Sequence, residues 1–160
     1  MTTSSQAGLY RALIEDLADA VIFTDRDGLI RLWNSSAEAV FGHRADEIIG
    51  KSLDVLIPDR LRSAHWAGFE TAMETGQLKH VRQSMMTRSI HKDGSDLYID
   101  MSFALVKDDT GLVLGAVAVA RDVTDRFNAE RDARKRLAEL EARVNSIAGD
   151  GQRSPPPSSG

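Results

Sequence analysis

The sequence predicts an α+β fold built as a single domain. Two short β-rich segments flank a turn within residues 20–34, and three further β-rich segments separated by turns occupy residues 78–124. Apolar residues at helical spacing occupy the stretch between them and both ends of the chain. A chain of 160 residues has the length of one domain and can bury roughly two-thirds of its unfolded surface. We therefore expect one core.

These patterns divide the chain into four segments. Residues 1–18 are predicted to form an amphipathic helix, residues 19–124 the globular domain, and residues 125–149 a C-terminal helix. Residues 150–160 are rich in Pro, Gly and Ser and are too polar to form a core, so we expect them to be disordered.

The first β-rich pair has the pattern of a hairpin. The segments AVIFTD and LIRLWN lie on either side of DRDG. Asp25, Asp27 and Gly28 are similar to part of a calcium loop, but the glycine comes too early and no Glu closes a loop of about twelve residues. Turn formation explains these residues better.

Three helices are predicted between the hairpin and the later strands. Ser35 or Ser36 can cap the first helix, Gly42 can end it, and Gly50 can end the second. The third helix is longer, follows a proline turn and ends at Gly76.

The long helix carries a histidine on its apolar face. His65 shares that face with Phe69, Ala72 and Met73, because residues three, four, seven and eight apart lie on one side of a helix. We therefore expect its imidazole to point where apolar side chains point.

The middle strand of the C-terminal meander is predicted to cover a core with one face. Leu97, Ile99, Met101 and Phe103 alternate with polar or small residues, and alternate residues of a strand share a face.

Composition argues against several classes of function. The 20 basic and 24 acidic residues leave a net charge of −4, which does not suggest a nucleic-acid partner. The chain has no cysteine, which excludes disulfides, thiolate zinc sites, cysteine nucleophiles and cysteinyl-flavin photochemistry.

No apolar run approaches the ~20 residues that span a bilayer, and no signal pattern opens the chain, so we expect a cytoplasmic protein without a membrane partner. Common catalytic motifs are missing, so we do not expect an enzyme.

Several segments carry a family resemblance. IFTDRDGLIRLWNSSAEAVFGHRADEIIGK, LIPDRLR, KDG and VARDVTDR follow one another in the chain. Together they resemble the PAS family of sensor domains, and the last segment is similar to the family's Asp-x-Thr exit into a signalling helix. The resemblance covers about residues 17–126 and identifies residues 19–124 as the PAS sensor domain. It implies a five-stranded antiparallel sheet with helices on one face and a pocket between the sheet and the longer helix.

A narrower resemblance concerns the segment LIPDRLRSAHWAGFETAMETG. It is similar to haem-binding PAS gas and oxygen sensors, in which a proline turn leads into Arg-Ser-x-His and this histidine is the axial iron ligand. The corresponding residue is His65, and a neutral imidazole on an apolar helix face is suited to ligate haem iron. The resemblance implies haem b as the cofactor, and O2, CO, NO or the redox state as the signal.

The distal side departs from that pattern. In the oxygen-sensing relatives an arginine on the next strand reaches the bound oxygen, and counting back from the KDG turn places Met85 there. Met85 could be a sixth iron ligand, or it could only line the pocket, which would favour CO or NO over O2. Either methionine of the Met85–Met86 pair could instead pack as flexible core, which we favour for Met86 on the opposite strand face.

The other candidate cofactor-binding residues surround His65 in this interpretation: Phe69, Met73, His80, Met101 and Phe103. His80 could offer a nitrogen to bound gas or compete as the distal ligand, or it could be an exposed residue at a strand end. Lys79 and Arg82 could pair with haem propionates or be solvated.

Two alternatives to haem stay open. A flavin, FAD or FMN, or a small metabolite could occupy the same pocket, with Trp33 near its entrance as the discriminating residue. A cofactor-free dimerisation module would instead have a collapsed pocket filled by Met85, Met101 and Phe103. Apolar pockets of all three kinds use the same residue types.

Output is expected through the terminal helices. Their apolar residues recur at spacings of three or four: Leu9, Leu13 and Leu17 in one, and Leu137, Leu140, Val144 and Ile147 in the other. We therefore predict a homodimer, with a C-terminal helix folded back on its own sheet as the alternative. A change at the pocket would shift the strand that ends at residues 121–124 and rotate the exit helix toward an unknown signalling partner.

Overall fold

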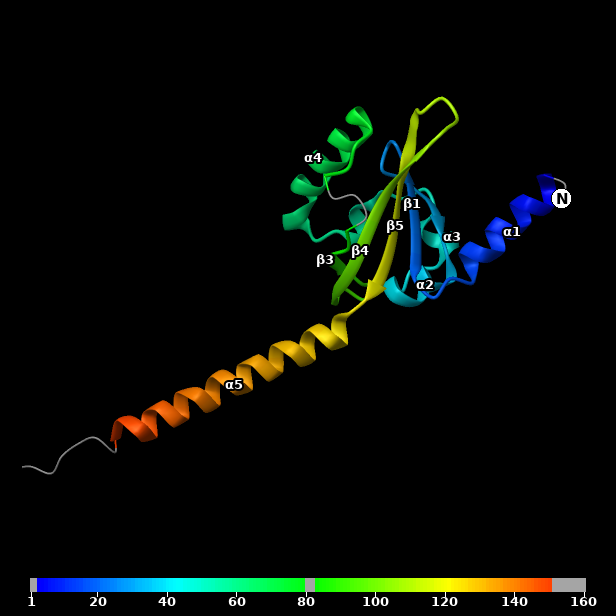
Figure 1. The fold of residues 1–160 in the computed structure, drawn as a ribbon. Coiled ribbons are helices and arrows are strands. Elements are labelled where there is room, and N and C mark those ends of the chain that lie inside the picture. Colours follow the sequence, from blue (N-terminus) through cyan, green and yellow to red (C-terminus); the bar gives the residue numbers. More distant parts are fainter. Residues whose placement is uncertain (1–2, 80–82, 151–160) are drawn as a thin grey trace, which may run out of the picture. The chain divides into compact units, whose positions relative to one another are not determined.

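Figure 1 shows a computed structural model of the chain, which describes residues 3–79 and 83–150. The chain divides into two compact units, Met1–Val123 and Thr124–Gly160. Within the described residues, the second unit consists of helix α5 (Thr124–Asp150). Across residues 3–79 and 83–150, every helix is too short or too polar to cross a membrane.

The first unit has a helix and two strands, then a run of helices, and then three strands. In chain order its elements are α1 (Thr3–Glu15), β1 (Ala20–Asp25), β2 (Ile30–Trp33), α2 (Ser35–Phe41), α3 (Ala45–Ile48), the 3-10 helix η1 (Leu53–Leu56), α4 (Asp59–Thr75), β3 (Met85–Ile90), β4 (Asp96–Lys107) and β5 (Val113–Asp122).

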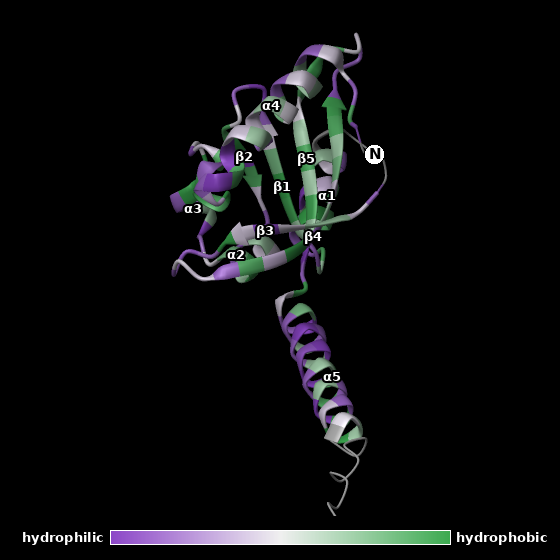
Figure 2. Ribbon diagram, turned by 90° about the vertical axis from the view of Figure 1, so that its left-hand side faces the viewer, coloured by the Kyte–Doolittle hydropathy of each residue, from purple (hydrophilic) through white to green (hydrophobic). Residues whose placement is uncertain are grey.

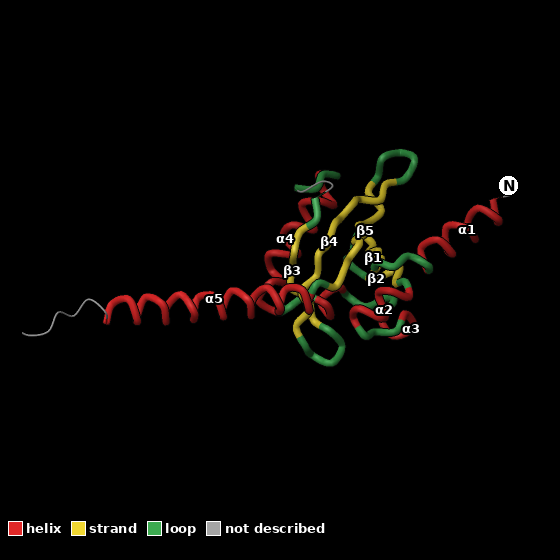
Figure 3. Tube along the Cα trace, turned by 60° about the horizontal axis from the view of Figure 1, so that its bottom comes forward, coloured by secondary structure: helices red, strands yellow, loops and turns green. Residues whose placement is uncertain are grey.

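The strands form one antiparallel sheet in the order β2-β1-β5-β4-β3 (Figures 1 and 3). The first and last strands in sequence, β1 and β5, lie side by side at the centre, and Figure 2 shows hydrophobic residues along both. The predicted α+β fold with a five-stranded antiparallel sheet is therefore confirmed.

Helices α2, α3 and α4 pack on one face of the sheet. Ile99 on β4 packs with Phe41 of α2 and Ile48 of α3, and all three are fully buried. Leu105, further along β4, packs in a second cluster with Met73 of α4. Since residues six apart on a strand share a face, α2, α3 and α4 cover the same side of the sheet.

The cap of α2 differs from the prediction. Helix α2 is capped by Asn34, not by Ser35 or Ser36. The buried Asn34 side chain accepts hydrogen bonds from the backbone N–H groups of Ala37 and Val21, at 3.0 and 2.9 Å. An asparagine has a carbonyl and an NH2 group, and its NH2 also donates to the carbonyl oxygens of Ile14 and Asp19. One amide therefore ties α1, β1 and α2 together.

Two element boundaries also differ. The strand predicted from residue 78 begins only at Met85, and residues 80–82 of that stretch lie outside the described residues. Helix α1 ends at Glu15, so Leu17 lies beyond it, although the predicted helix extended to residue 18.

The acidic hairpin loop is a turn. Asp25 Oδ1 accepts hydrogen bonds of 3.0 Å from the backbone N–H groups of Asp27 and Leu29, and its Oδ2 pairs with Arg31. Gly28 has a positive φ of 74°. These bonds give both oxygens of the Asp25 carboxylate a partner within the hairpin, so no calcium ion is needed to explain it.

Candidate functional site

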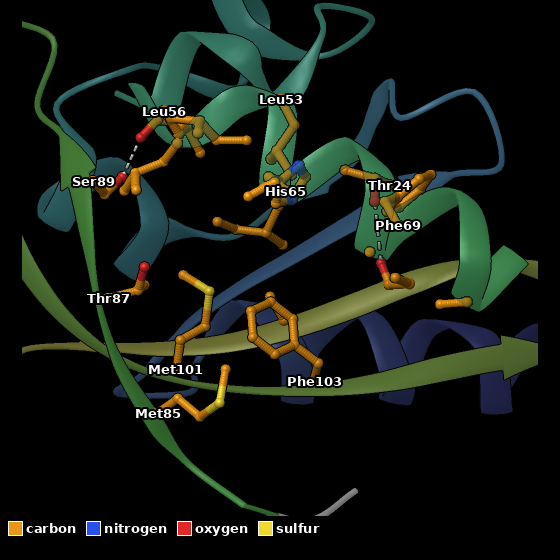
Figure 4. Close-up of a pocket in the computed structure, with 18 of the residues that line it drawn as sticks. Thr24, Leu53, Leu56, His65, Phe69, Met85, Thr87, Ser89, Met101 and Phe103 are labelled. Carbon is orange, nitrogen blue, oxygen red and sulfur yellow. Dashed lines mark hydrogen bonds between the residues drawn. The ribbon is translucent and has the colours of Figure 1, made fainter. Parts of the chain in front are cut away.

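A cavity of about 430 Å³ lies between α4 and the sheet (Figure 4). Most of its wall is apolar, and every strand except β2 contributes to it, together with η1 and α4. A cavity of this size falls within the range of small-molecule sites. It sits on the α4 half of the covered face.

Helix α4 is held at its N-terminal end by the segment before it. Arg62 Nε donates to the carbonyl oxygen of Ile57 at 3.1 Å, and its Nη2 donates to that of Asp54 at 3.1 Å. The Trp66 indole N–H donates to Asp54 Oδ1 at 2.7 Å. These bonds fix the first two turns of the helix against η1.

The opposite end of α4 is held by β4. Gly76 ends the helix in a left-handed conformation, as predicted, with φ of 66°, and its carbonyl oxygen accepts a hydrogen bond from Lys107 Nζ at 3.0 Å. The helix is thus anchored at both ends and bridges the cavity in between.

Trp66 also anchors α4 to the β1–β2 turn. An added Cβ on Gly28 would lie 2.2 Å from the Trp66 ring, a distance that no side-chain carbon tolerates. The indole therefore depends on a glycine backbone at this position.

His65 lies in the wall that α4 contributes. Its ring is half-buried between two aromatic neighbours, with Trp66 edge-on at 5.0 Å and Phe69 nearly parallel at 6.2 Å between ring centroids. Among the described residues, His65 Nδ1 is the one buried side-chain nitrogen or oxygen that has no hydrogen-bond partner. A buried polar atom without a partner is costly.

Burial favours the neutral form of the His65 imidazole. Burial lowers its pKa, because the charged form loses solvation, and the nearby Asp54 carboxylate opposes that effect only in part. A neutral imidazole has a free nitrogen lone pair, which is the form that ligates metals.

The facing wall includes sulfur and aromatic side chains. Met85, Met101 and Phe103 come from β3 and β4 and point into the cavity across from His65 (Figure 4). Met85 is 39% exposed, so this wall is open at its edge. These residues line an open space, which is not the collapsed pocket expected of a cofactor-free module.

The structure brings six of the seven candidate cofactor-binding residues to this cavity: His65, Phe69, Met73, Met85, Met101 and Phe103. The seventh, His80, lies outside the described residues, as does Arg82. Met86 is 56% exposed and is not part of the wall, and neither is the exposed Lys79.

The expected position of Trp33 near the pocket entrance is wrong. Its side chain is buried against Phe41, with ring centroids 5.3 Å apart, and its indole N–H donates to the carbonyl oxygen of His43. Trp33 belongs to the α2 cluster and does not line the cavity, so it cannot discriminate between ligands.

Sequence reasoning missed several wall residues. Thr87 follows Met85 by two positions on β3, and Ala116 and Ala118 alternate along β5, so the period of two was the available signal. Leu53 and Leu56 had no such signal, because they come from a 3-10 helix whose position depends on the loop around it.

The polar wall atoms other than His65 Nδ1 are mostly satisfied within the chain. Ser89 Oγ donates to the Leu56 carbonyl oxygen at 2.6 Å, and Thr24 Oγ1 makes a longer contact of 3.5 Å with that of Ala116 (Figure 4). In the part of the chain that the structure describes, groups of three or more His, Cys, Asp or Glu side chains able to hold a metal ion do not occur. A metal at His65 would therefore need a cofactor that supplies most of its ligands.

A single sheet, helices over one face and a hollow beneath one of them define a small α+β binding domain. A family model described as "PAS fold" matches residues 8–123, which is most of the chain, and the chain belongs to the PAS family. It is a signalling domain of the sensor type.

Three known proteins illustrate the similarity. The sensor protein kinase WalK of Staphylococcus aureus strain Newman is 28% identical over 139 residues, which cover 86% of this chain and 21% of the kinase. The crystal structure of a PAS domain from Colwellia psychrerythraea aligns with a TM-score of 0.65 and 22% identity, over 75% of this chain and 98% of that chain. An RNA-binding light-oxygen-voltage receptor aligns with a TM-score of 0.65 and 20% identity, over 91% of this chain and 40% of that one.

The chain spans about a fifth of the length of the first curated relatives it matches, 17% and 21%. These similarities define the family and the fold. None of the three proteins described above is named as a haem protein, so the haem hypothesis depends on the cavity.

Proposed function

We propose that this PAS domain is a sensor that holds a largely apolar cofactor or ligand in the α4–sheet cavity through His65, with haem b as the first candidate. The observation that carries the proposal is the imidazole in an apolar wall, with a buried nitrogen that has no partner among the described residues. A ligand that supplies such a partner would remove an energetic cost that the empty domain bears.

The residues present fit a haem group. His65 would hold the iron, Phe69 and Met73 would contact the porphyrin, and the thioether of Met85 on the facing wall would be available as a further iron ligand that a gas would have to displace. A bound haem would supply a redox-active iron that takes up a diatomic gas. The cavity offers the apolar surroundings that a porphyrin requires.

Flavin is the second candidate, because the light-oxygen-voltage receptor shares this fold. The polar edge of a flavin carries several hydrogen-bonding groups, each of which is costly to bury without a partner. The described wall contains no Asn or Gln side chain for that edge, and we therefore rank flavin below haem. A small apolar metabolite with one polar group would need fewer partners.

Reconstitution with haem tests the proposal. We expect a Soret band that is abolished in His65→Leu and retained in His43→Leu, a matched histidine whose ring is absent from the cavity wall. Circular dichroism checks that both variants fold. Absence of a Soret shift in the natural chain, or an unchanged band in His65→Leu, would rule out haem at this site, and a flavin spectrum after purification would favour the second candidate.

Output through a homodimer extends this proposal. Strand β5 supplies Ala116 and Ala118 to the cavity and ends at Asp122, two residues before α5 begins. A ligand that displaces β5 would therefore act directly on the start of α5. Equal dimer affinity with and without the ligand would argue against this coupling.

Cytoplasmic location and lack of enzymatic activity remain predictions of the sequence.

A further inference from the structure

The thioethers of methionine are the only sulfur groups in this chain, because it has no cysteine. Of its five methionines, Met73, Met85, Met86 and Met101 lie in the described residues. A thioether takes up one oxygen atom to give methionine sulfoxide, which is polar, and a reductase can reverse the change. The position of each thioether therefore decides what its oxidation does to the domain.

The four described thioethers differ in exposure and in direction. Met73 is buried, with 6% of its surface exposed, whereas Met86 is 56% exposed but points away from the cavity, because successive residues of a strand alternate. Met101 lines the cavity and packs against the buried α2 cluster. Met85 is the described methionine that is both exposed, at 39%, and part of the cavity wall.

Met85 is held in the wall by its place at the start of β3. This strand lies at the edge of the sheet, next to β4. Met85 pairs with Met101 across the two strands, and paired residues share a face of the sheet. The Ser84 hydroxyl donates a hydrogen bond to the Asp100 carboxylate, which ties the start of β3 to β4. Figure 4 shows both thioethers on the wall that faces His65.

We propose that Met85 is an oxidation site, and that its conversion to the sulfoxide by a hydroperoxide lowers the affinity of the cavity for apolar ligands. A lone pair of the Met85 sulfur bonds to one peroxide oxygen as the O–O bond breaks. The proton of that oxygen passes to the leaving oxygen, so hydrogen peroxide leaves as water. The sulfur is oxidised by two electrons and the peroxide is reduced by two. The inference rests on the proposed use of the cavity as a ligand site, but not on haem.

The sulfoxide changes what a ligand meets at this wall. A thioether is a weak hydrogen-bond acceptor, whereas the S=O group is polar. Water reaches Met85 at the open edge of the wall, so oxidation costs the empty domain little. An apolar ligand in the cavity removes that water and leaves the S=O group without a partner, which is costly. Oxidation therefore acts on ligand binding more than on folding.

Peptide mass mapping tests whether peroxide reaches the Met85 sulfur. The full chain is treated with dilute hydrogen peroxide, and oxygen uptake at each methionine is followed over time. We expect Met85 to gain one oxygen at least about tenfold faster than the buried Met73, with the exposed Met86 as the reference for a freely accessible thioether. Oxidation of Met85 as slow as that of Met73 overturns the proposal.

Binding of a neutral apolar fluorophore, N-phenyl-1-naphthylamine, tests the consequence. We expect the natural chain to bind it, peroxide to weaken this binding at least about tenfold, and a methionine sulfoxide reductase to restore it. In Met85→Leu the affinity should be the same before and after peroxide, whereas Met86→Leu should lose affinity as the natural chain does. Binding that survives complete oxidation of Met85, or a loss that persists in Met85→Leu, contradicts the proposal.

A polar substitution tests the same site without an oxidant. Met85→Gln places a polar side chain of similar length in the wall, and we expect it to bind the fluorophore at least about tenfold more weakly than Met86→Gln, its matched control. Circular dichroism checks that both variants fold, and equal binding by the two overturns the proposal.

The fluorophore also separates this inference from the haem proposal. A natural chain that binds the fluorophore but gives no Soret band rejects haem and leaves the oxidation site in place. A natural chain that binds neither rejects the cavity as a ligand site, and the oxidation proposal with it.

Discussion

The two halves of the covered sheet face differ in how they are filled. Beside α2 and α3, Phe41, Ile30, Ile48 and Ile99 are fully buried, and so is the hydrogen-bonded Asn34. Beside α4, the same face opens into a cavity, and only Ala72, Met73 and Val113 form a small buried cluster. The first half stabilises the fold, and the second half gives up packing for space in which a ligand can lie.

Truncation of a large side chain on each half should show the largest contrast. Phe41→Ala is expected to lower the free energy of unfolding by about 3–5 kcal/mol, because it opens a cavity in closely packed core. Phe103→Ala, in a wall that is already open, should lower it by only about 1 kcal/mol. Denaturant unfolding of both variants measures the difference, and equal losses would mean that the cavity is filled in solution.

The contact between α4 and the β1–β2 turn should have an intermediate effect. Gly28→Ala meets both a positive φ and the Trp66 ring, so we expect a loss of about 2–3 kcal/mol. Gly50→Ala is the control, since its φ is 85° but no atom lies near its added Cβ, and about 1 kcal/mol is expected. Thermal unfolding compares the two, and a smaller loss for Gly28→Ala than for Gly50→Ala would show that the Trp66 contact is unimportant.

Removal of the polar atom from the cavity should have a small effect of opposite sign. His65→Leu replaces a buried nitrogen that lacks a partner in the described part of the chain, so without a ligand the variant should be about 1 kcal/mol more stable. Destabilisation of the ligand-free variant would indicate that His65 has a partner in solution.

Acid should lower the free energy of unfolding gradually, through the protonation of His65 on the α4 half. The pKa of His65 in the folded state is lowered by burial, so below the unfolded value of about 6.5 the unfolded chain binds a proton that the folded chain does not. Stability is therefore complete above that pH and falls as the pH drops through it, until the folded imidazole also titrates.

The pH dependence of unfolding between about pH 7 and pH 5 measures this effect. We expect it to be reduced, but not abolished, in His65→Leu, because burial also lowers the pKa of His43. An unchanged pH profile in His65→Leu would contradict a lowered pKa for His65.

Much of the fold and part of the site followed from periodicity. The alternation of Leu97, Ile99, Met101 and Phe103 predicted the covered face, and helical spacing placed His65 and Phe69 on one side of α4. The cap of α2 was missed because serine and asparagine are both good caps. Asn34 is the cap because its amide also bonds to backbone groups that α1 and β1 bring to the same place.

The sequence by itself determined the order of helices and strands, the alternating faces and the heptad pattern of α5, because each depends on spacing along one segment. Only the tertiary structure decided that Trp33 lies buried away from the cavity, that Leu53 and Leu56 join its wall, and that His65 Nδ1 has no partner within residues 3–79 and 83–150. Those outcomes depend on which segments distant in the chain come together, and packing between distant segments leaves no period in the sequence.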